Sequence, residues 1–248
     1  MPSLIGPRAG LLHNTLIMQL PILDPQNPNQ NFPALETALT DPDGLLAAGG
    51  CLSSRRIINA YKQGIFPWYS PGEPILWWSP NPRLVLFPEN LIVSRSLRKT
   101  IRKATFSITY DQAFSQVMQY CAAPREEESG TWITEEMCQA YTQLHQQGVA
   151  HSVETWFEDE LVGGLYGIAI GQVFFGESMF HRKTDASKVA FCYLVNQLSE
   201  WDYQLIDCQV HTHHLSSLGA EEISRDNFSS LIKQYCSIQP NDKAWKTP

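Results

Sequence analysis

Hydrophobic residues recur every three or four positions in several segments, which is the period of a helix with one buried face. In SSRRIINAYKQG, Ser53 or Ser54 would cap the helix and Gly64 would end it, and Gly148 would end the helix of TEEMCQAYTQLHQQG. A shorter helix is expected over residues 94–104. The longer helical segments are SSRRIINAYKQG, DQAFSQVMQYC, TEEMCQAYTQLHQQG, TDASKVAFCYLVNQLSEW (capped by Thr184 or Asp185) and RDNFSSLIKQYC.

Between the third and fourth of these helices the pattern changes to short apolar and alternating runs, which indicate strands. HSVETWF and LVGGLYGIAI are separated by the acidic turn EDE, and VFFGESMF follows after GQ, so the three runs predict an antiparallel meander. FSITY, earlier in the chain, and LIDCQV, later in the chain, read as further strands. A meander followed by a helix and a returning strand predicts an α+β domain from residue 105 to 240, with a mostly antiparallel sheet.

The chain before this domain is richer in loops. Residues 1–31 contain the polar run DPQNPNQN and are expected to form a flexible leader. Residues 32–104 are expected to form a small N-terminal domain, loop-rich up to Pro88. Within it, GIFPWYSPGEPILWWSPNPR holds three tryptophans and five prolines, and proline's fixed φ and missing donor predict an irregular loop instead of a helix or central strand. Residues 241–248 are expected to be a tail.

Composition is that of a globular protein, with 43% apolar and 17% charged residues among 248. The net charge of -7 argues against wholesale coating by nucleic acid, although a local basic patch stays possible. Six cysteines without a C-x-x-C pair argue against a zinc knuckle or a redox dithiol. The N-terminus lacks the layout of a signal peptide and no apolar run approaches membrane-spanning length, so a soluble, cytoplasmic protein is expected.

Positive charge is concentrated in SRSLRKTIRK, and no acid lies between Glu89 and Asp111. Four of its cations are spaced i, i+3, i+4 and i+7, which places them on one helix face. This stripe consists of Arg95, Arg98, Lys99 and Arg102, extended by Lys103. An ordinary solvated face would look the same. The concentration of these charges in an acidic protein favours phosphate binding.

Aromatic residues in the proline-rich loop suggest a stacking surface. Nearby prolines lower the entropy cost of holding a ring in place, and a held ring can stack on a nucleobase. Trp77 and Trp78 are interpreted as a small satellite core between domains. Trp68, between Pro67 and Tyr69, is the better candidate for a stacking ring.

Polar side chains interrupt two apolar strands. Asp207 and Gln209 stand at i and i+2 in LIDCQV, so both leave the same face, and Glu177 is the one acid in FFGESMF. Buried carboxylates and amides are costly unless they are paired or used. A structural hydrogen bond and a chemical role are both open for these residues.

Neither a metal site nor a cysteine nucleophile is expected. His211, His213 and His214 lie close together in sequence, but no separated ligand or H-E-x-x-H motif accompanies them. No cysteine stands in a recognisable activating context.

Taken in order, several motifs resemble those of the leucyl/phenylalanyl-tRNA–protein transferase family, from about Phe32 to Tyr235. They are DPDGLLAAGG, GIFPWYSPGEPILWWSPNPR, GTWIT, AHSVETW, ELVGGLYG, FFGESMF, ASK and LIDCQV. The resemblance implies an enzyme of the bacterial N-end rule pathway that moves leucine or phenylalanine, and methionine less well, from aminoacyl-tRNA to proteins with N-terminal Arg or Lys. It also implies a catalytic domain similar to GNAT acyltransferases, no metal or nucleotide cofactor, no membrane partner and a monomer.

The same resemblance implies residue roles. Trp68 would stack on the 3′-terminal adenosine of the tRNA, and Glu177 would hold the free amino group of the aminoacyl moiety. Asp207 would orient Gln209, whose carbonyl oxygen would receive a proton from the attacking amine. The basic stripe would contact the tRNA backbone.

The resemblance also implies a pocket for the leucine or phenylalanine side chain, lined by Leu165, Met179 and Ile206, with Tyr141 near the acceptor end. The sequence departs from the family pattern at Leu194, where an aromatic residue is expected. The sequence therefore does not decide which residue forms the inner wall of the pocket.

Two other function classes are compatible with parts of the sequence. An acyl-CoA-dependent GNAT acetyltransferase would hold the pyrophosphate on a glycine-rich turn entering a helix, but HRKTDASKVAF contains no glycine. A non-catalytic tRNA-binding or adaptor-binding module would use the basic stripe and Trp68. It would have no need for Asp207, Gln209 and Glu177.

Overall fold

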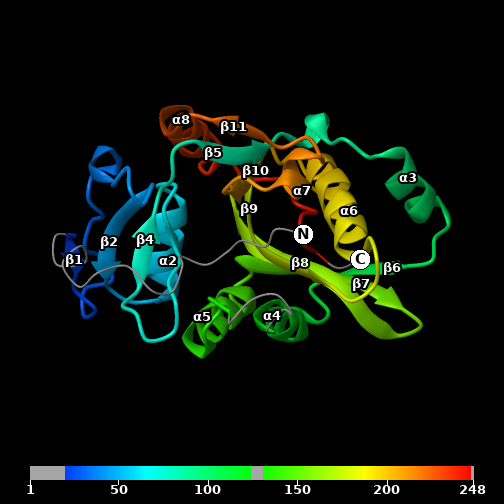
Figure 1. Cartoon of the computed structure of the whole chain (residues 1–248), viewed down its shortest axis with the longest axis horizontal. Helices are drawn as coiled ribbons and strands as arrows, with labels where there is room; N and C mark the ends of the chain where they lie inside the picture. The colour runs from blue at the N-terminus through cyan, green and yellow to red at the C-terminus, as the bar shows by residue number, and fades with distance from the viewer. Residues whose placement is uncertain (1–19, 124–130, 247–248) are drawn as a thin grey trace.

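A computed structural model describes residues 20–123 and 131–246 of the chain. These residues form a four-stranded sheet of order β1-β2-β4-β3 and a seven-stranded sheet of order β11-β5-β10-β9-β8-β7-β6. The small sheet lies at one end of the long axis, and the larger sheet extends from the middle toward the other end (Figure 1). The strands are β1 (Ile22–Leu23), β2 (Leu45–Gly49), β3 (Phe66–Pro67), β4 (Leu76–Trp78), β5 (Arg83–Leu86), β6 (Ser107–Tyr110), β7 (Ala150–Phe157), β8 (Glu160–Ile170), β9 (Val173–His181), β10 (Leu205–Gln209) and β11 (Glu221–Ile223).

The helical segments expected from hydrophobic periodicity are confirmed. They are α2 (Ser54–Tyr61), α3 (Arg95–Arg102), α4 (Phe114–Ala122), α5 (Glu135–Gln146), α6 (Ala186–Glu200) and α8 (Arg225–Tyr235), joined by the short α7 (His213–Ser216), η1 (Leu35–Thr37) and η2 (Pro88–Asn90). Ser53 is the N-cap of α2, and its hydroxyl accepts from the backbone N–H of Arg56. Gly64 and Gly148 take positive φ after α2 and α5, as helix-ending glycines do.

The larger sheet carries helices on both faces (Figure 1). β7, β8 and β9 form the expected antiparallel meander, and β10 returns parallel to β9 after α6. One apolar cluster fills the face covered by α4 and α5, and a second fills the face covered by α6. The expected α+β class with a mostly antiparallel C-terminal sheet is confirmed, while the smaller N-terminal sheet was not expected from the sequence. Among the described residues, no helix is both long enough and apolar enough to cross a bilayer.

Part of the expected leader is held against the small sheet. β1 pairs in parallel with β2, and Leu23 is buried. The fully buried Arg56 donates from its guanidinium to the carbonyl oxygens of Asn27 and Gln30, each at 2.5 Å. The expectation of a flexible leader is therefore wrong for residues 20–31, while residues 1–19 lie outside the described part. The polar composition of this segment concealed that its backbone is fixed by an arginine of α2.

The proline-rich stretch is more regular than expected. It contains β3 and β4, and β4 is an inner strand between β2 and β3. Pro74 and Pro80 lie outside the three residues of β4, and Pro67 belongs to β3, an edge strand, where a missing N–H is tolerated. Trp77 and Trp78 are buried as expected, and their indole N–H groups donate to the carbonyl oxygens of Gly49 (2.9 Å) and Trp68 (2.6 Å).

The larger sheet also takes a strand from the chain before residue 104. β5 follows Pro82 and pairs with both β10 and β11, with Asp207 opposite Val85. The loop-rich expectation for this segment is wrong, because the apolar run RLVL is a short strand that is buried on both sides. At the other end of the chain, Trp245 of the expected tail stacks on His151 with the ring centroids 3.9 Å apart.

Candidate functional site

The strands β9 and β10 separate in the middle of the larger sheet. Their parallel pairing ends at Asp207 opposite Phe175, although β9 continues to His181. Irregularities in register fall beside Glu177 on β9 and between Asp207 and Gln209 on β10. Gln209 has a φ of 63°, a left-handed conformation that is uncommon outside glycine and typical of functional sites. Glu177 and Gln209 therefore project where the sheet opens.

Asp207 is held by a buried ion pair that the sequence did not reveal. Arg83 donates from Nε to Oδ1 at 2.8 Å and from Nη2 to Oδ2 at 2.7 Å, and both residues are fully buried. The guanidinium lies between the rings of Phe66 and Phe228, 4.8 and 4.6 Å from their centroids. Asp207 Oδ1 also accepts from the backbone N–H of Gln209 at 2.9 Å. The ion pair thereby fixes the backbone that carries Gln209.

Glu177 is buried beneath Gln209 and accepts hydrogen bonds from three side chains. Tyr61 donates to Oε1 at 2.5 Å, Gln209 Nε2 donates to the same oxygen at 3.0 Å, and Tyr141 donates to Oε2 at 3.0 Å. Burial raises the pKa of Glu177 from its ordinary value of 4.5 to about 8, against the lowering effect of these hydrogen bonds. Burial also raises the pKa of both tyrosines.

A count of protons agrees with this raised pKa. The hydroxyls of Tyr61 and Tyr141 are 2.7 Å apart and each contacts Glu177, so the three groups make three close oxygen–oxygen contacts. Each contact needs one proton, and the two hydroxyls supply two of them. All three contacts are satisfied only when the carboxyl group supplies the third, and Tyr141 then accepts from Glu177 and donates to Tyr61. The closed arrangement therefore matches a protonated Glu177 in the free protein.

Trp68 and Gln209 line one small pocket. Its walls are Phe66, Pro67, Trp68, Trp132, Gln209 and Val210. Trp68 is partly exposed and packs edge-on against Trp78, with the ring centroids 5.6 Å apart. Because Gln209 donates its amide nitrogen to Glu177, its carbonyl oxygen is the atom left to accept from a molecule in the pocket. The structure thus brings Trp68, Gln209 and Glu177 together.

The residues expected around the amino acid side chain lie on the other face of the sheet. Leu165, Met179 and Ile206 belong to the apolar cluster under α6, and Leu165 pairs directly with Met179 across β8 and β9. Glu177 contacts Tyr61 and Tyr141 on the opposite face. Leu194, the residue that departs from the family pattern, is fully buried in the α6 cluster. The four apolar residues thus share one cluster, separated from Glu177 by the sheet.

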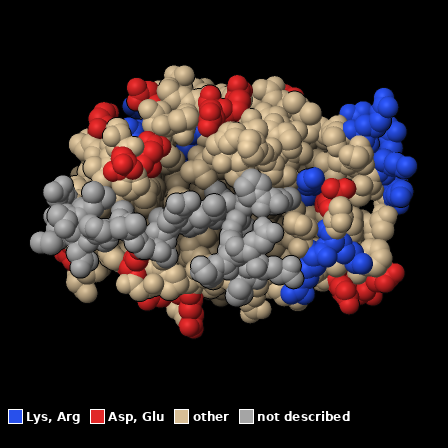
Figure 2. All heavy atoms as spheres, viewed as in Figure 1, with Lys and Arg blue, Asp and Glu red and all other residues tan. Residues whose placement is uncertain are grey.

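The basic stripe forms the exposed face of α3. Its five cations are exposed, while Leu97 is buried against the core. Ser94 caps the helix by accepting from the N–H of Leu97. α3 lies at the end of the molecule away from the small sheet, where Lys and Arg gather on the surface (Figures 1 and 2). The stripe is therefore separate from the Trp68 pocket.

Three residues of the site were missed in the sequence. Arg83 stands alone in an apolar run, which is a signal for a buried charge that needs a partner. Tyr61 lies on the buried face of α2, where the hydrophobic periodicity does not distinguish it from an ordinary core residue. Trp132 belongs to the GTWIT motif but was not given a role.

Within residues 20–123 and 131–246, no group of three or more His, Cys, Asp or Glu is arranged to hold a metal ion.

Comparisons with known proteins relate the chain to a family. Among solved structures, it is similar to a GCN5-related N-acetyltransferase from Kribbella flavida (TM-score 0.36, 13% identity, 67% of this chain and 60% of that chain). It is also similar to L-PGS from Bacillus licheniformis (TM-score 0.39, 12% identity, 54% of this chain and 49% of that chain). These likenesses are weak, and the fold class rests on the sheet order described above.

Sequence relatives are much closer. The family model described as leucyl/phenylalanyl-tRNA protein transferase matches residues 85–233, and the model of its N-terminal domain matches residues 50–81. A leucyl/phenylalanyl-tRNA–protein transferase of Nitrosomonas europaea is 62% identical over 86% of this chain and 91% of its own length. One of Methylococcus capsulatus is 53% identical over 92% and 97%. The chain therefore belongs to the leucyl/phenylalanyl-tRNA–protein transferase family, as its motifs predicted.

Proposed function

We propose that this protein transfers leucine or phenylalanine, and methionine less well, from aminoacyl-tRNA to proteins whose N-terminal residue is Arg or Lys. The observation that carries the proposal is that Trp68 and Gln209 line one pocket and that Gln209 contacts the buried Glu177 behind it. A stacking ring, an amide oxygen and a buried carboxyl group are the groups that an aminoacyl-adenosine and an attacking amine need. The protein acts as a cytoplasmic monomer in the N-end rule pathway and needs no cofactor.

The donor end is recognised by stacking and by charge. Trp68 stacks on the 3′-terminal adenosine, and its contact with Trp78 keeps the indole in place. Glu177 receives the amino group of the aminoacyl moiety. The neutral amine takes the proton of Glu177 as it binds, because a cationic amine beside the carboxyl group favours the ionised carboxylate. Tyr61 and Tyr141 then donate to both of its oxygens.

The acceptor amine attacks the ester carbonyl carbon. The new C–N bond forms as the C–O bond to the ribose breaks, and the departing ribose oxygen takes up the proton that the amine loses. An α-amino group has a pKa of about 7.7–8.0, so part of it is neutral near pH 7 and no strong base is needed. The Gln209 carbonyl oxygen accepts a hydrogen bond from the amine as its N–H becomes acidic, and Asp207 holds the Gln209 backbone. Holding the two reactants in line supplies much of the acceleration.

The side chain of the transferred amino acid points toward the α6 face at the place where the pairing of β9 with β10 ends. Leu165, Met179 and Ile206 lie in the apolar cluster there. Leu194 provides the inner wall in place of an aromatic residue.

The direct test is to mix the protein with labelled Phe-tRNA and peptides that begin with Lys, Arg or Ala. Label is expected in the Lys and Arg peptides and not in the Ala peptide. Label in none of the peptides would contradict the proposal. Thermal stabilisation by acetyl-CoA together with no transfer would favour the acetyltransferase alternative.

Replacing Trp68 by alanine is expected to raise the KM for Phe-tRNA about 5- to 150-fold, because stacking of a base on an aromatic ring contributes about 1–3 kcal/mol. Trp68→Phe keeps a ring and should retain part of the affinity. The KM for the acceptor peptide is the internal control, since it should change little. An unchanged KM for Phe-tRNA in Trp68→Ala would remove the stacking role.

Reversing two charges of the basic stripe, in Arg98→Glu with Arg102→Glu, is expected to weaken tRNA binding and to reduce its dependence on salt, because fewer counterions are released. The affinity for Phe-tRNA is measured from 50 to 300 mM salt. Lys233→Glu on α8, an exposed cation outside the stripe, is the control. If the affinity and its salt slope match those of the control, α3 does not contact the RNA backbone.

A further inference from the structure

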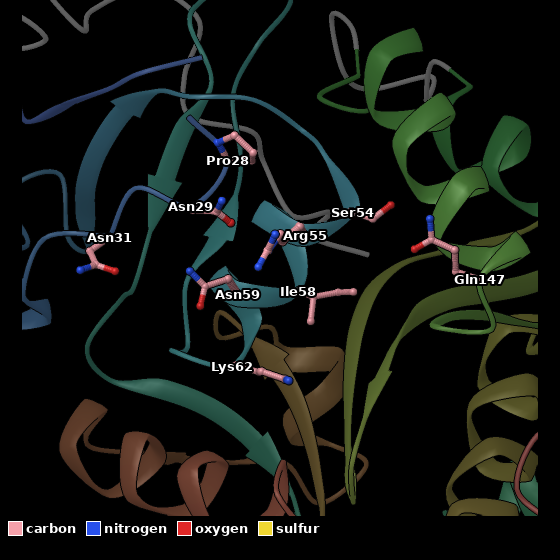
Figure 3. A pocket seen from close by; sticks show the side chains of 9 residues that line it. All are labelled: Pro28, Asn29, Asn31, Ser54, Arg55, Ile58, Asn59, Lys62 and Gln147. Atoms are coloured by element: carbon pink, nitrogen blue, oxygen red, sulfur yellow. The ribbon is translucent and has the colours of Figure 1, made fainter. Parts of the chain in front are cut away.

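A second, polar groove lies on the outer side of α2 (Figure 3). It has a volume of about 700 Å³ and is open to solvent along one side. Three elements enclose it: the exposed face of α2, the segment that α2 fixes through Arg56, and the end of α5. The lining residues are Pro28, Asn29, Asn31, Ser54, Arg55, Ile58, Asn59, Lys62 and Gln147.

The α2 wall of this groove carries cations at both ends. Arg55, Ile58, Asn59 and Lys62 are spaced i, i+3, i+4 and i+7, so they share one face of the helix. Arg55 and Lys62 are therefore about 10 Å apart along the axis. Both side chains are exposed, and no described carboxylate lies within ion-pair distance of either.

The rest of the lining is neutral and able to donate hydrogen bonds. Asparagine and glutamine side chains come from all three walls, and none of the lining residues is acidic. The Ser54 hydroxyl is buried and has no hydrogen-bond partner among the described residues. Two cations and several neutral donors, without a carboxylate among them, are the groups that bind a phosphate-bearing anion.

The position of α2 indicates which phosphate-bearing anion the groove could bind, because this helix lies between the groove and the Glu177 site. On its inner face Tyr61 reaches Glu177, and the next residue, Lys62, lines the groove. An anion in the groove is therefore separated from the Glu177 site by about one helix diameter of 10–12 Å. The basic stripe on α3 lies at the other end of the molecule (Figure 1).

We propose that this groove binds the phosphodiester backbone of the aminoacyl-tRNA close to its 3′ end. The proposal rests on the proposed function and adds a second RNA-binding surface, independent of α3. The groove binds the strand that leads into the Trp68 pocket, and α3 contacts a more distant part of the same RNA. Arg55 and Lys62 neutralise phosphates, and the amides and Ser54 donate to phosphate oxygens.

The test compares the double variant Arg55→Gln with Lys62→Gln against a matched double variant at the other end of the chain, Lys243→Gln with Lys246→Gln. Both pairs are exposed, so both proteins should unfold at the wild-type temperature. The dissociation constant for Phe-tRNA is measured at several salt concentrations. Transfer is measured from Phe-tRNA and from 3′-O-phenylalanyl-adenosine, which carries no phosphodiester.

The groove variant is expected to bind Phe-tRNA about tenfold more weakly, with a salt slope smaller by about 1.4–1.8, as expected when two cations no longer contact phosphates. Its transfer from phenylalanyl-adenosine should equal that of the wild type. Tight tRNA binding by this variant would overturn the proposal, as would an equal loss with both donors, which would mean that α2 acts through Tyr61. Preferential loss of binding to an acidic peptide would identify a protein partner and also overturn it.

The two proposals can fail separately. If the wild-type protein binds tRNA through Arg55 and Lys62 but transfers nothing to any peptide, the groove stands and the proposed function fails. If the groove variant binds tRNA as tightly as the wild type while transfer proceeds, the function stands and the groove fails.

Discussion

Replacing Arg83 by methionine is expected to lower the free energy of unfolding by about 3–5 kcal/mol and to abolish transfer. The change leaves the fully buried Asp207 carboxylate without its cation, and an unpaired buried charge is strongly destabilising. Arg83 also joins distant parts of the fold, because its guanidinium contacts Phe66 on β3 of the small sheet and Phe228 on α8. Urea unfolding measures the loss, and the transfer assay with labelled Phe-tRNA measures the activity.

A double variant separates stability from function. Arg83→Met with Asp207→Leu removes both charges, and a buried ion pair replaced by apolar residues is often as stable as the original. The free energy of unfolding should therefore recover most of the loss. Transfer should not recover, because the backbone N–H of Gln209 loses its acceptor on Asp207. Wild-type transfer by the double variant would show that the ion pair serves the fold alone.

The elements of the larger sheet could be predicted because each has a clear local signal. The meander has alternating apolar runs and short acidic or glycine turns, and α6 has a long apolar periodicity. β5 and β4 gave no such signal, since three or four residues are too few to show a period. Their strand character comes from pairing with partners far along the chain, such as Asp207 opposite Val85.

Part of the candidate site could also be predicted from the sequence, because some of its residues give a local signal. Glu177, Asp207 and Gln209 stand out because polar residues interrupt apolar strands. What they contact could not be read from the chain, because Arg83 is 124 positions from Asp207 and Tyr61 is 116 positions from Glu177. The face on which Met179 lies was also hidden, since a single irregularity in register beside Glu177 shifts the alternation of side chains.

Replacing Glu177 by glutamine is expected to reduce transfer about 10- to 150-fold while preserving the fold. Glutamine resembles the protonated carboxyl group, so its oxygen can accept from Tyr61 and its nitrogen can donate toward Tyr141. It cannot become an anion when the cationic amine of the donor binds, and a hydrogen bond to a charged group contributes about 1.5–3 kcal/mol. Rates measured with Phe-tRNA and a Lys peptide give the effect. Equal rates for the two proteins would exclude Glu177 as the amine's partner.

The same variant reports the protonation of Glu177 through stability. The folded-state pKa of about 8 lies above the ordinary value of 4.5, so between these pH values the folded protein holds more protons than the unfolded chain. The stabilising contribution is complete below about pH 4.5 and is lost as the pH rises through 8, with a slope of at most about 1.4 kcal/mol per pH unit. Unfolding free energies from pH 5 to 9 should therefore fall more steeply with pH in the wild type than in Glu177→Gln. Parallel curves would mean that Glu177 is already ionised in the free protein. The carboxyl proton that satisfies the third contact among Glu177, Tyr61 and Tyr141 would then be absent.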